Sequence, residues 1–138
     1  AATPEAACVA AHLPRVRYKR LLLAEDALVL REWVRHSLAE QGYEVQVAAT
    51  GLEAWQWLQQ HPVDILVTDI EMPALDGWGL LQRVRQSEAL RRLPVVLYSS
   101  HGEESYRLRG LELGADYYVQ KQGMDTEALL RAVTALVG

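Results

Sequence analysis

The stretch Ile65-Leu66-Val67-Thr68-Asp69-Ile70-Glu71-Met72-Pro73 decides the fold of this chain. Its apolar start, β-branched at two of the first three positions, is typical of a buried strand. Pro73 has no backbone N–H to add to a strand, so the strand must end before it. Asp69 therefore stands at the end of a core strand over residues 65–69, where a carboxylate is costly to bury without a partner. The rest of the chain is expected to supply that partner.

Length and composition describe one soluble domain. The chain has 138 residues, of which 50% are hydrophobic and 23% are charged, ordinary values for a globular protein. A net charge of −4 argues against nucleic acid or an anionic membrane as the partner, and no apolar run approaches the ~18–20 residues of a membrane span. The lone Cys8 has no internal disulfide partner, which favours a reducing, cytoplasmic location.

The first 19 residues differ from the remainder. They contain Ala and Pro without a sustained period, which predicts a linker or tail over residues 1–19 and a folded domain over residues 20–138. Because the chain opens with Ala rather than Met, we expect it to be a piece of a longer or processed protein.

From Arg20 onward, apolar runs alternate with amphipathic stretches. The second amphipathic stretch opens with Thr50-Gly51-Leu52-Glu53, which has the spacing of a capping box. The alternation is typical of a doubly wound α/β fold with a five-stranded parallel sheet. The predicted strands cover residues 21–24, 44–47, 65–69, 95–98 and 117–120. The predicted helices cover residues 28–41, 78–86, 103–113 and 125–137, the last with Asp125 as N-cap, and a further helix opens at Thr50 and ends before Pro62.

Residues with strong chemistry follow four of these strands. In such sheets ligands bind beyond the carboxyl ends of the strands, and those ends carry Glu25 and Asp26, then Asp69, then Ser99, then Lys121. Close carboxylates repel by up to about 4 kcal/mol per pair at an effective dielectric of ~20, so a cation is expected among them. Oxygen ligands without His or Cys favour Mg²⁺ or Mn²⁺.

The remaining groups suit phosphoryl transfer. An ammonium from Lys121, a hydroxyl from Ser99 and a divalent cation around one carboxylate form a cradle for a phosphoryl group that is transferred to Asp69. Ser100 is an alternative source of the hydroxyl.

These motifs resemble the receiver domain of two-component response regulators over residues 20–138. The matching pieces are Glu25-Asp26, the stretch from Asp69 to Pro73 with Asp76-Gly77, Ser99, and Tyr118-x-x-Lys121. The resemblance implies a flavodoxin-like sheet of strand order 2-1-3-4-5.

The resemblance also implies roles around the acceptor. Asp69 is then the phosphoacceptor, and Asp26 binds Mg²⁺ directly. Glu25 acts on the ion through water or helps to hold it, and the backbone carbonyl of Glu71 completes the protein's ligands.

Further roles follow from the same resemblance. Ser99 and Lys121 bind the phosphoryl oxygens. Ser99 and Tyr118 are the switch residues, and Tyr118 is the aromatic residue whose rotamer follows phosphorylation. The donor is a histidine kinase or phosphotransfer domain, and a protein partner reads the face made by residues 103–113, 117–120 and 125–137. Such a domain phosphorylates and dephosphorylates itself without an external product, so it is not an enzyme in the usual sense.

A narrower resemblance concerns the C-terminal part. Gly114-Ala115-Asp116-Tyr117-Tyr118, with Lys121 not followed by Pro, is similar to the receiver at the end of chemotaxis-type hybrid histidine kinases. Most receivers have a cis Lys-Pro bond here. A cis bond before a non-proline residue costs ~2.5–4 kcal/mol, so we predict a trans bond between Lys121 and Gln122.

Rival interpretations remain open at this stage. The chain is alternatively a receiver-fold interaction module without phosphorylation, or a phosphatase of the haloacid-dehalogenase type, although that family places an Asp-x-Asp motif on its first strand. Glu71 is either a solvated turn residue or a modulator of the phosphoryl lifetime. Tyr118 is either the switch or plain packing. His101 is interpreted as a surface residue, and the four tryptophans as core filling.

Overall fold

The computed structural model describes residues 18–138. The predicted tail over residues 1–19 lies outside the described residues apart from its last two. The strands are β1 (Arg20–Ala24), β2 (Glu44–Ala48), β3 (Ile65–Thr68), β4 (Val95–Ser99) and β5 (Tyr117–Gln120). The helices are α2 (Leu28–Glu40), α3 (Gly51–Gln60), α4 (Gly77–Gln86), α5 (Glu104–Glu112) and α6 (Glu127–Val137).

The five strands form one parallel sheet in the order β2-β1-β3-β4-β5, as predicted. The chain moves outward from β1 to β2, then returns past β1 to add β3, β4 and β5. The strand order therefore reverses between β1 and β3. Loops that leave these two strands diverge to opposite faces, which opens a crevice at their carboxyl ends.

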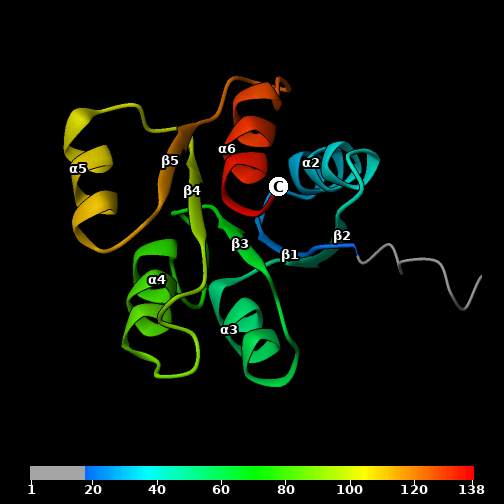
Figure 1. Cartoon of the computed structure of the whole chain (residues 1–138). Helices are drawn as coiled ribbons and strands as arrows, with labels where there is room; N and C mark the ends of the chain where they lie inside the picture. The colour runs from blue at the N-terminus through cyan, green and yellow to red at the C-terminus, as the bar shows by residue number, and fades with distance from the viewer. Residues whose placement is uncertain (1–17) are drawn as a thin grey trace, which may run out of the picture.

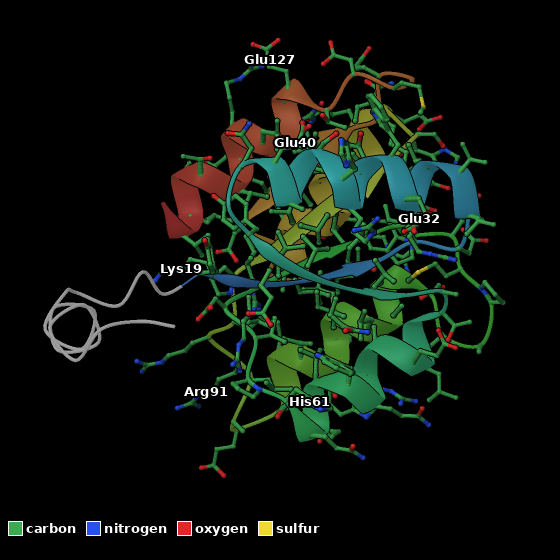
Figure 2. All side chains as sticks on the ribbon, turned by 90° about the vertical axis from the view of Figure 1, so that its right-hand side faces the viewer. Lys19, Glu32, Glu40, His61, Arg91 and Glu127 are labelled. Atoms are coloured by element: carbon green, nitrogen blue, oxygen red, sulfur yellow. The ribbon has the colours of Figure 1, made fainter. Side chains whose placement is uncertain are left out.

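Helices cover both faces of the sheet (Figure 1). On one face, α3, α4 and α5 pack over Leu22, Leu66 and Leu97. On the other face, α2 and α6 pack over Leu23, Val67 and Val96. Figure 2 shows α2 and α6 together on one side of the sheet and α3 on the other. Because both faces are covered, the central strands are continuous apolar runs, as the sequence indicated.

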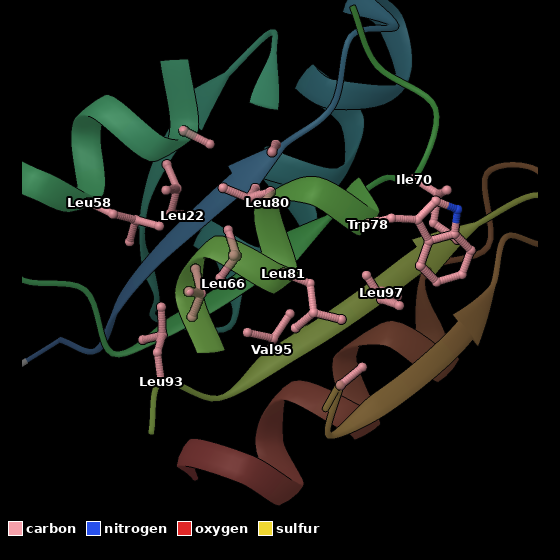
Figure 3. Packing of buried hydrophobic residues seen from close by; sticks show 14 of the residues in the cluster. Leu22, Leu58, Leu66, Ile70, Trp78, Leu80, Leu81, Leu93, Val95 and Leu97 are labelled. Carbon is pink, nitrogen blue, oxygen red and sulfur yellow. The ribbon is translucent and has the colours of Figure 1, made fainter. Parts of the chain in front are cut away.

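Helix α4, which follows the loop after Asp69, is held in place by the hydrophobic core. Leu80, Leu81 and Trp78 of α4 lie against Leu66 and Leu97 of the sheet (Figure 3). Burial of a Leu side chain contributes roughly 1.5–3 kcal/mol. This packing fixes the position of α4 relative to β3, and with it the loop between them.

Local signals in the sequence behave largely as predicted. The Thr50 hydroxyl accepts a hydrogen bond from the Glu53 N–H at 3.0 Å. The Glu53 carboxylate accepts one from the N–H of Ala49 at 2.7 Å, one residue before the N-cap. The Lys121–Gln122 bond is trans, as predicted, and the described chain contains no cis peptide bond.

Two sequence interpretations are wrong in detail. Trp33 is not core filling: 42% of its surface is exposed, and its Nε1–H donates to the carbonyl of Met124 at 2.7 Å. The N-cap of α6 is Thr126 rather than Asp125, although an Asp125 carboxylate oxygen still accepts from the Glu127 N–H.

Within residues 18–138, no helix has the length and apolarity to cross a membrane.

Candidate functional site

The residues predicted from the strand ends come together at the carboxyl edge of the sheet. Sheet-like hydrogen bonds continue past the strands: the Asp69 N–H donates to the carbonyl of Ala24 at 2.9 Å, and the Lys121 N–H donates to that of Ser99 at 2.7 Å. The backbone that carries the acidic and basic side chains is therefore fixed by the ladder itself, not by flexible loops.

Three carboxylates form the centre of the site. One oxygen from each of Glu25, Asp26 and Asp69 lies within 4.8 Å of the others. Glu25 and Asp69 are buried, with 2% and 9% exposure, whereas Asp26 is exposed. A cluster of hard oxygen atoms that is open on one side suits a divalent ion such as Mg²⁺, which keeps some of its water ligands. The donor set thus fits the ion that the sequence predicted.

Lys121 places its ammonium between two of these carboxylates. Its Nζ lies 2.6 Å from Glu25 Oε1 and 3.2 Å from Asp69 Oδ2. Burial alone would lower the pKa of Lys121, but the hydrogen bond to Glu25 and the charges of Asp69 and Glu25 outweigh it and raise the pKa. Lys121 therefore stays protonated and neutralises part of the acidic cluster.

Glu25 is the most constrained of the acids. Burial, as the largest cause, raises the pKa of its carboxyl group. Its Oε2 accepts a hydrogen bond from the Ala27 N–H at 3.2 Å, while its backbone carbonyl accepts one from Arg31 at 3.1 Å. These contacts hold Glu25 against the start of α2, facing Lys121.

The loop after β3 is tightly folded around Asp69. Asp69 Oδ1 accepts from the N–H of Ile70 at 2.7 Å, and the N–H of Gly77 donates to the Ile70 carbonyl at 2.7 Å. Ala74 has a φ of 69°, and the Leu75 N–H donates to the carbonyl of Pro73 across it at 2.8 Å, which makes a γ-turn of the rare, strained form. The loop closes on itself and leaves Asp69 Oδ2 facing Lys121.

Ser99, and not Ser100, belongs to the site. Ser99 is 1% exposed, whereas Ser100 is exposed on the surface. The Ser99 Oγ accepts a hydrogen bond from the N–H of His101 at 3.1 Å. The same hydroxyl also carries a proton that it can donate, which is what binding an anionic oxygen requires.

Tyr118 lies inside the molecule. It is 6% exposed and its hydroxyl donates to the backbone carbonyl of His101 at 2.6 Å. Burial raises the pKa of this phenol, so the hydroxyl remains a donor. The side chain thus meets the segment that follows Ser99, two residues from the hydroxyl of the site.

The sequence analysis interpreted His101 as a surface residue and did not predict its contacts at the rim of the site. The His101 imidazole Nε2 forms a short contact with the carboxylate of Glu71, and its Nδ1 lies 3.3 Å from Glu103 Oε2. The ring also stacks on Tyr106, with centroids 4.3 Å apart. The spacing places Glu71 and His101 each two residues after a site residue on neighbouring strands, which puts both near the rim but does not specify their contact.

Fold and site together define a class: a flavodoxin-like α/β domain whose strand ends carry three acids, a hydroxyl and a lysine around one crevice. The model of the response regulator receiver domain matches residues 21–134. The chain belongs to this family of two-component signalling domains, whose members bind Mg²⁺ at an acidic pocket and receive phosphoryl groups from histidine kinases.

Known proteins of the family resemble the chain in sequence. It is 33% identical over 123 residues to the gliding motility regulatory protein of Myxococcus xanthus, covering 89% of this chain and 16% of that protein. The chain also spans only about half the length of other relatives: 46% of the response regulator GtcR of Aneurinibacillus migulanus, 56% of the probable transcriptional regulator ycf29 of Porphyra purpurea and 45% of ycf27 of Guillardia theta. The match is thus to one domain of larger proteins.

Solved structures agree with the fold. The chemotaxis response regulator CheY4 of Vibrio cholerae superposes with a TM-score of 0.81 at 26% identity, covering 88% of this chain and all of that one. The receiver domain of the sensor histidine kinase PA1611 of Pseudomonas aeruginosa, with magnesium in its active-site cleft, gives a TM-score of 0.80 at 25% identity. That match covers 88% of this chain and 99% of the other.

Proposed function

We propose that this domain accepts a phosphoryl group from a phosphohistidine onto Asp69 and changes its partner interactions as a result. The observation that supports this most directly is the convergence of Lys121, Ser99 and two further acids on one buried carboxylate. A carboxylate in such surroundings is a nucleophile with its charge compensation already in place.

The transfer is a simple displacement. A carboxylate oxygen of Asp69 forms a bond to phosphorus, while the bond from phosphorus to the donor's imidazole nitrogen breaks and the imidazole leaves as the neutral base after taking up a proton. Lys121 and Ser99 bind the oxygens of the transferred group, and Tyr118 responds to the change. Hydrolysis of the aspartyl phosphate by water returns the resting domain and inorganic phosphate.

A divalent ion is part of this proposal. Asp26 and Asp69 supply carboxylate oxygens and the backbone carbonyl of Glu71 a further ligand, with Glu25 acting through water or holding the ion. Mg²⁺, or Mn²⁺ in its place, would neutralise charge on the phosphoryl oxygens during transfer.

Protein donors reach the site across an apolar surface. Leu28, Val29 and Trp33 of α2 and Met124 of the β5–α6 loop are between 42% and 75% exposed, and Leu28 lies two residues after Asp26. Exposed apolar groups gathered in this way mark interaction surfaces. We infer that a histidine kinase or phosphotransfer domain covers this surface, while α5, β5 and α6 present the face that a downstream partner reads.

The larger context proposed here is the C-terminal receiver of a chemotaxis-like hybrid kinase in the cytoplasm. The small share of the Myxococcus protein that the chain matches, and the similarity to a receiver of a sensor histidine kinase, support a domain within a longer signalling protein. The coding sequence that flanks this domain tests the context, and a gene for the receiver alone would contradict it.

The phosphoacceptor role is tested by mass spectrometry after incubation with acetyl phosphate and Mg²⁺. We expect the native chain to gain the mass of one phosphoryl group, and Asp69→Asn to gain none. Asp64→Asn is the matched control, because Asp64 lies at the opposite end of β3 and an Asn there can still accept the hydrogen bond from the Arg20 N–H.

Two results would contradict the proposal. An unmodified native chain would favour an interaction module that works without phosphorylation. Sustained release of phosphate from small phosphate esters, far above the protein concentration, would instead favour a phosphatase of the haloacid-dehalogenase type.

A further inference from the structure

The side chain of His101 ties together two loops at the rim of the site. Its imidazole contacts the carboxylate of Glu71, in the loop after β3, and that of Glu103, the N-cap of α5. The ring stacks on Tyr106 in the first turn of α5 with an interplanar angle of 13°. We call His101, Glu71, Glu103 and Tyr106 the His101 cluster.

The backbone of His101 meets both residues that are predicted to switch. Its N–H donates to the hydroxyl of Ser99, and its carbonyl accepts from the hydroxyl of Tyr118. Ser99 and Tyr118 are thus both hydrogen-bonded to the backbone of the same residue. A displacement of the His101 backbone would change both hydrogen bonds together.

We propose that the His101 cluster is a positioning device that holds the segment after β4 in its resting arrangement and so opposes the phosphorylation-linked movement of Tyr118. This inference rests on the proposed function. Glu71 is carried by the loop that holds Asp69, and α5 carries Glu103 and Tyr106. Displacing the segment therefore breaks contacts to two separate elements at once.

The side chains of His101 and Glu71 are partly exposed, so their contact restrains the segment after β4 only modestly. The side chain of His101 is 29% exposed and that of Glu71 is 68% exposed. Ion pairs at such positions contribute little to stability because water and salt screen them. A restraint of this kind biases an equilibrium between two arrangements without locking either one.

The chemistry of the contacts permits a clean test. Ser99 and Tyr118 use only the backbone of His101, so His101→Ala removes the cluster and keeps both hydrogen-bonding groups. Glu71→Ala removes one contact from the other loop. Glu104→Gln is the control. Glu104 is exposed next to Glu103, and this substitution removes one negative charge, as Glu71→Ala does.

The first measurement uses the full chain without any ligand. Fluorotyrosine is incorporated, and the ¹⁹F signal of Tyr118 is assigned by its absence in Tyr118→Phe, since the chain holds 6 tyrosines. We expect His101→Ala and Glu71→Ala to shift this signal toward its position in the beryllofluoride complex, and Glu104→Gln to leave it in place.

The second measurement is the affinity for beryllofluoride with Mg²⁺. Removing a restraint on the resting arrangement should tighten binding roughly fivefold in either single variant, a typical size for coupling between two sites. Because Glu71 acts on the segment through its contact with His101, the double variant should bind no more tightly than His101→Ala alone.

The outcomes separate this inference from the proposed function. If the native chain binds no beryllofluoride, the phosphoacceptor proposal fails, and the Tyr118 signal of the ligand-free variants still decides whether the His101 cluster restrains that residue. An unmoved Tyr118 signal in both variants, or fully additive effects on affinity, would overturn the inference.

Discussion

Lys121 stands closer to Glu25 than to Asp69, at 2.6 Å against 3.2 Å. Its pKa is raised because two carboxylates outweigh its burial, so it carries its charge throughout the neutral range. The absence of a following proline put this geometry in question at the level of sequence. The trans bond to Gln122 nevertheless leaves the ammonium within reach of both acids, because the Lys121 N–H remains paired to the Ser99 carbonyl.

Ser99→Ala should slow phosphorylation by acetyl phosphate roughly 100-fold, the usual cost of losing one donor aimed at a developing oxyanion. The hydroxyl of Ser99 is buried at the end of β4 and can donate a hydrogen bond to a phosphoryl oxygen. The rate of mass gain with Mg²⁺ measures this effect. Ser100→Ala is the control and should match the native rate, because Ser100 is exposed. If Ser99→Ala and Ser100→Ala slowed phosphorylation equally, the predicted role of Ser99 in binding the phosphoryl group would be wrong.

The loop between β3 and α4 depends on a glycine at the first position of the helix. A Cβ on Gly77 would lie 2.1 Å from the carbonyl oxygen of Asp69 and 2.8 Å from the Cα of Ile70. Both neighbours are backbone atoms, which cannot turn aside as a side chain can. The close approach therefore couples the start of α4 to the position of Asp69.

Gly77→Ala should lower the free energy of unfolding by about 1–3 kcal/mol, the usual cost of forcing atoms into a packed site. It should also slow phosphorylation, because the backbone of Asp69 must shift. Gly79→Ala is the control in the same helix: its Cβ would meet chiefly the end of the Leu75 side chain, which can rotate away. Denaturant unfolding and phosphorylation rates measure both. A Gly77→Ala variant as stable and as active as Gly79→Ala would contradict the expectation.

The sequence was sufficient for the elements because each carries a local signal. The apolar runs, the Thr50 capping box and the glycine stops lie within a few residues of what they determine. The strand-end residues could be predicted for a related reason, since a parallel sheet brings its carboxyl ends to one edge whatever the loops do. The contact between Glu71 and His101 could not be predicted from the sequence, because it depends on how two separate loops fold beyond that edge.

The exposure of side chains on the flanks of a helix could not be predicted from the sequence either. Trp33 shares the apolar stripe of α2 with Val34 and Leu38, which are buried against the sheet. Trp33 lies one position to the side, where the helix turns away from the sheet and meets the β5–α6 loop instead. The helical spacing of apolar residues predicted that Trp33 belongs to the core. Its burial depends instead on how wide the contact between helix and sheet is.

Among residues 18–138, two groups of exposed apolar side chains lie far apart on the domain. The first, on α2 and the β5–α6 loop, comprises Leu28, Val29, Trp33 and Met124 and adjoins Asp26. The second comprises Leu108 and Leu111 of α5 with Tyr117 of β5, each between 41% and 50% exposed. Figure 1 shows α2 and α5 on opposite sides of the domain. A donor on the first surface and a partner on the second can therefore bind without overlapping.

This separation predicts that the two surfaces can be disabled independently. Val29→Asp should slow phosphoryl transfer from a phosphorylated histidine kinase or phosphotransfer domain at least tenfold, because a charge at an apolar contact loses its hydration on binding. The same variant should keep the native rate with acetyl phosphate, which needs no docking surface. Both rates are measured by mass gain on Asp69.

Leu108→Asp is the matched control, since Leu108 is also an exposed apolar residue but lies on α5. It should leave both rates unchanged and weaken only the binding of a partner to the phosphorylated domain. Circular dichroism should show native folding for both variants, because neither side chain belongs to the core. If Val29→Asp slowed transfer from acetyl phosphate as much as from the protein donor, the surface on α2 would serve the site itself and not the donor.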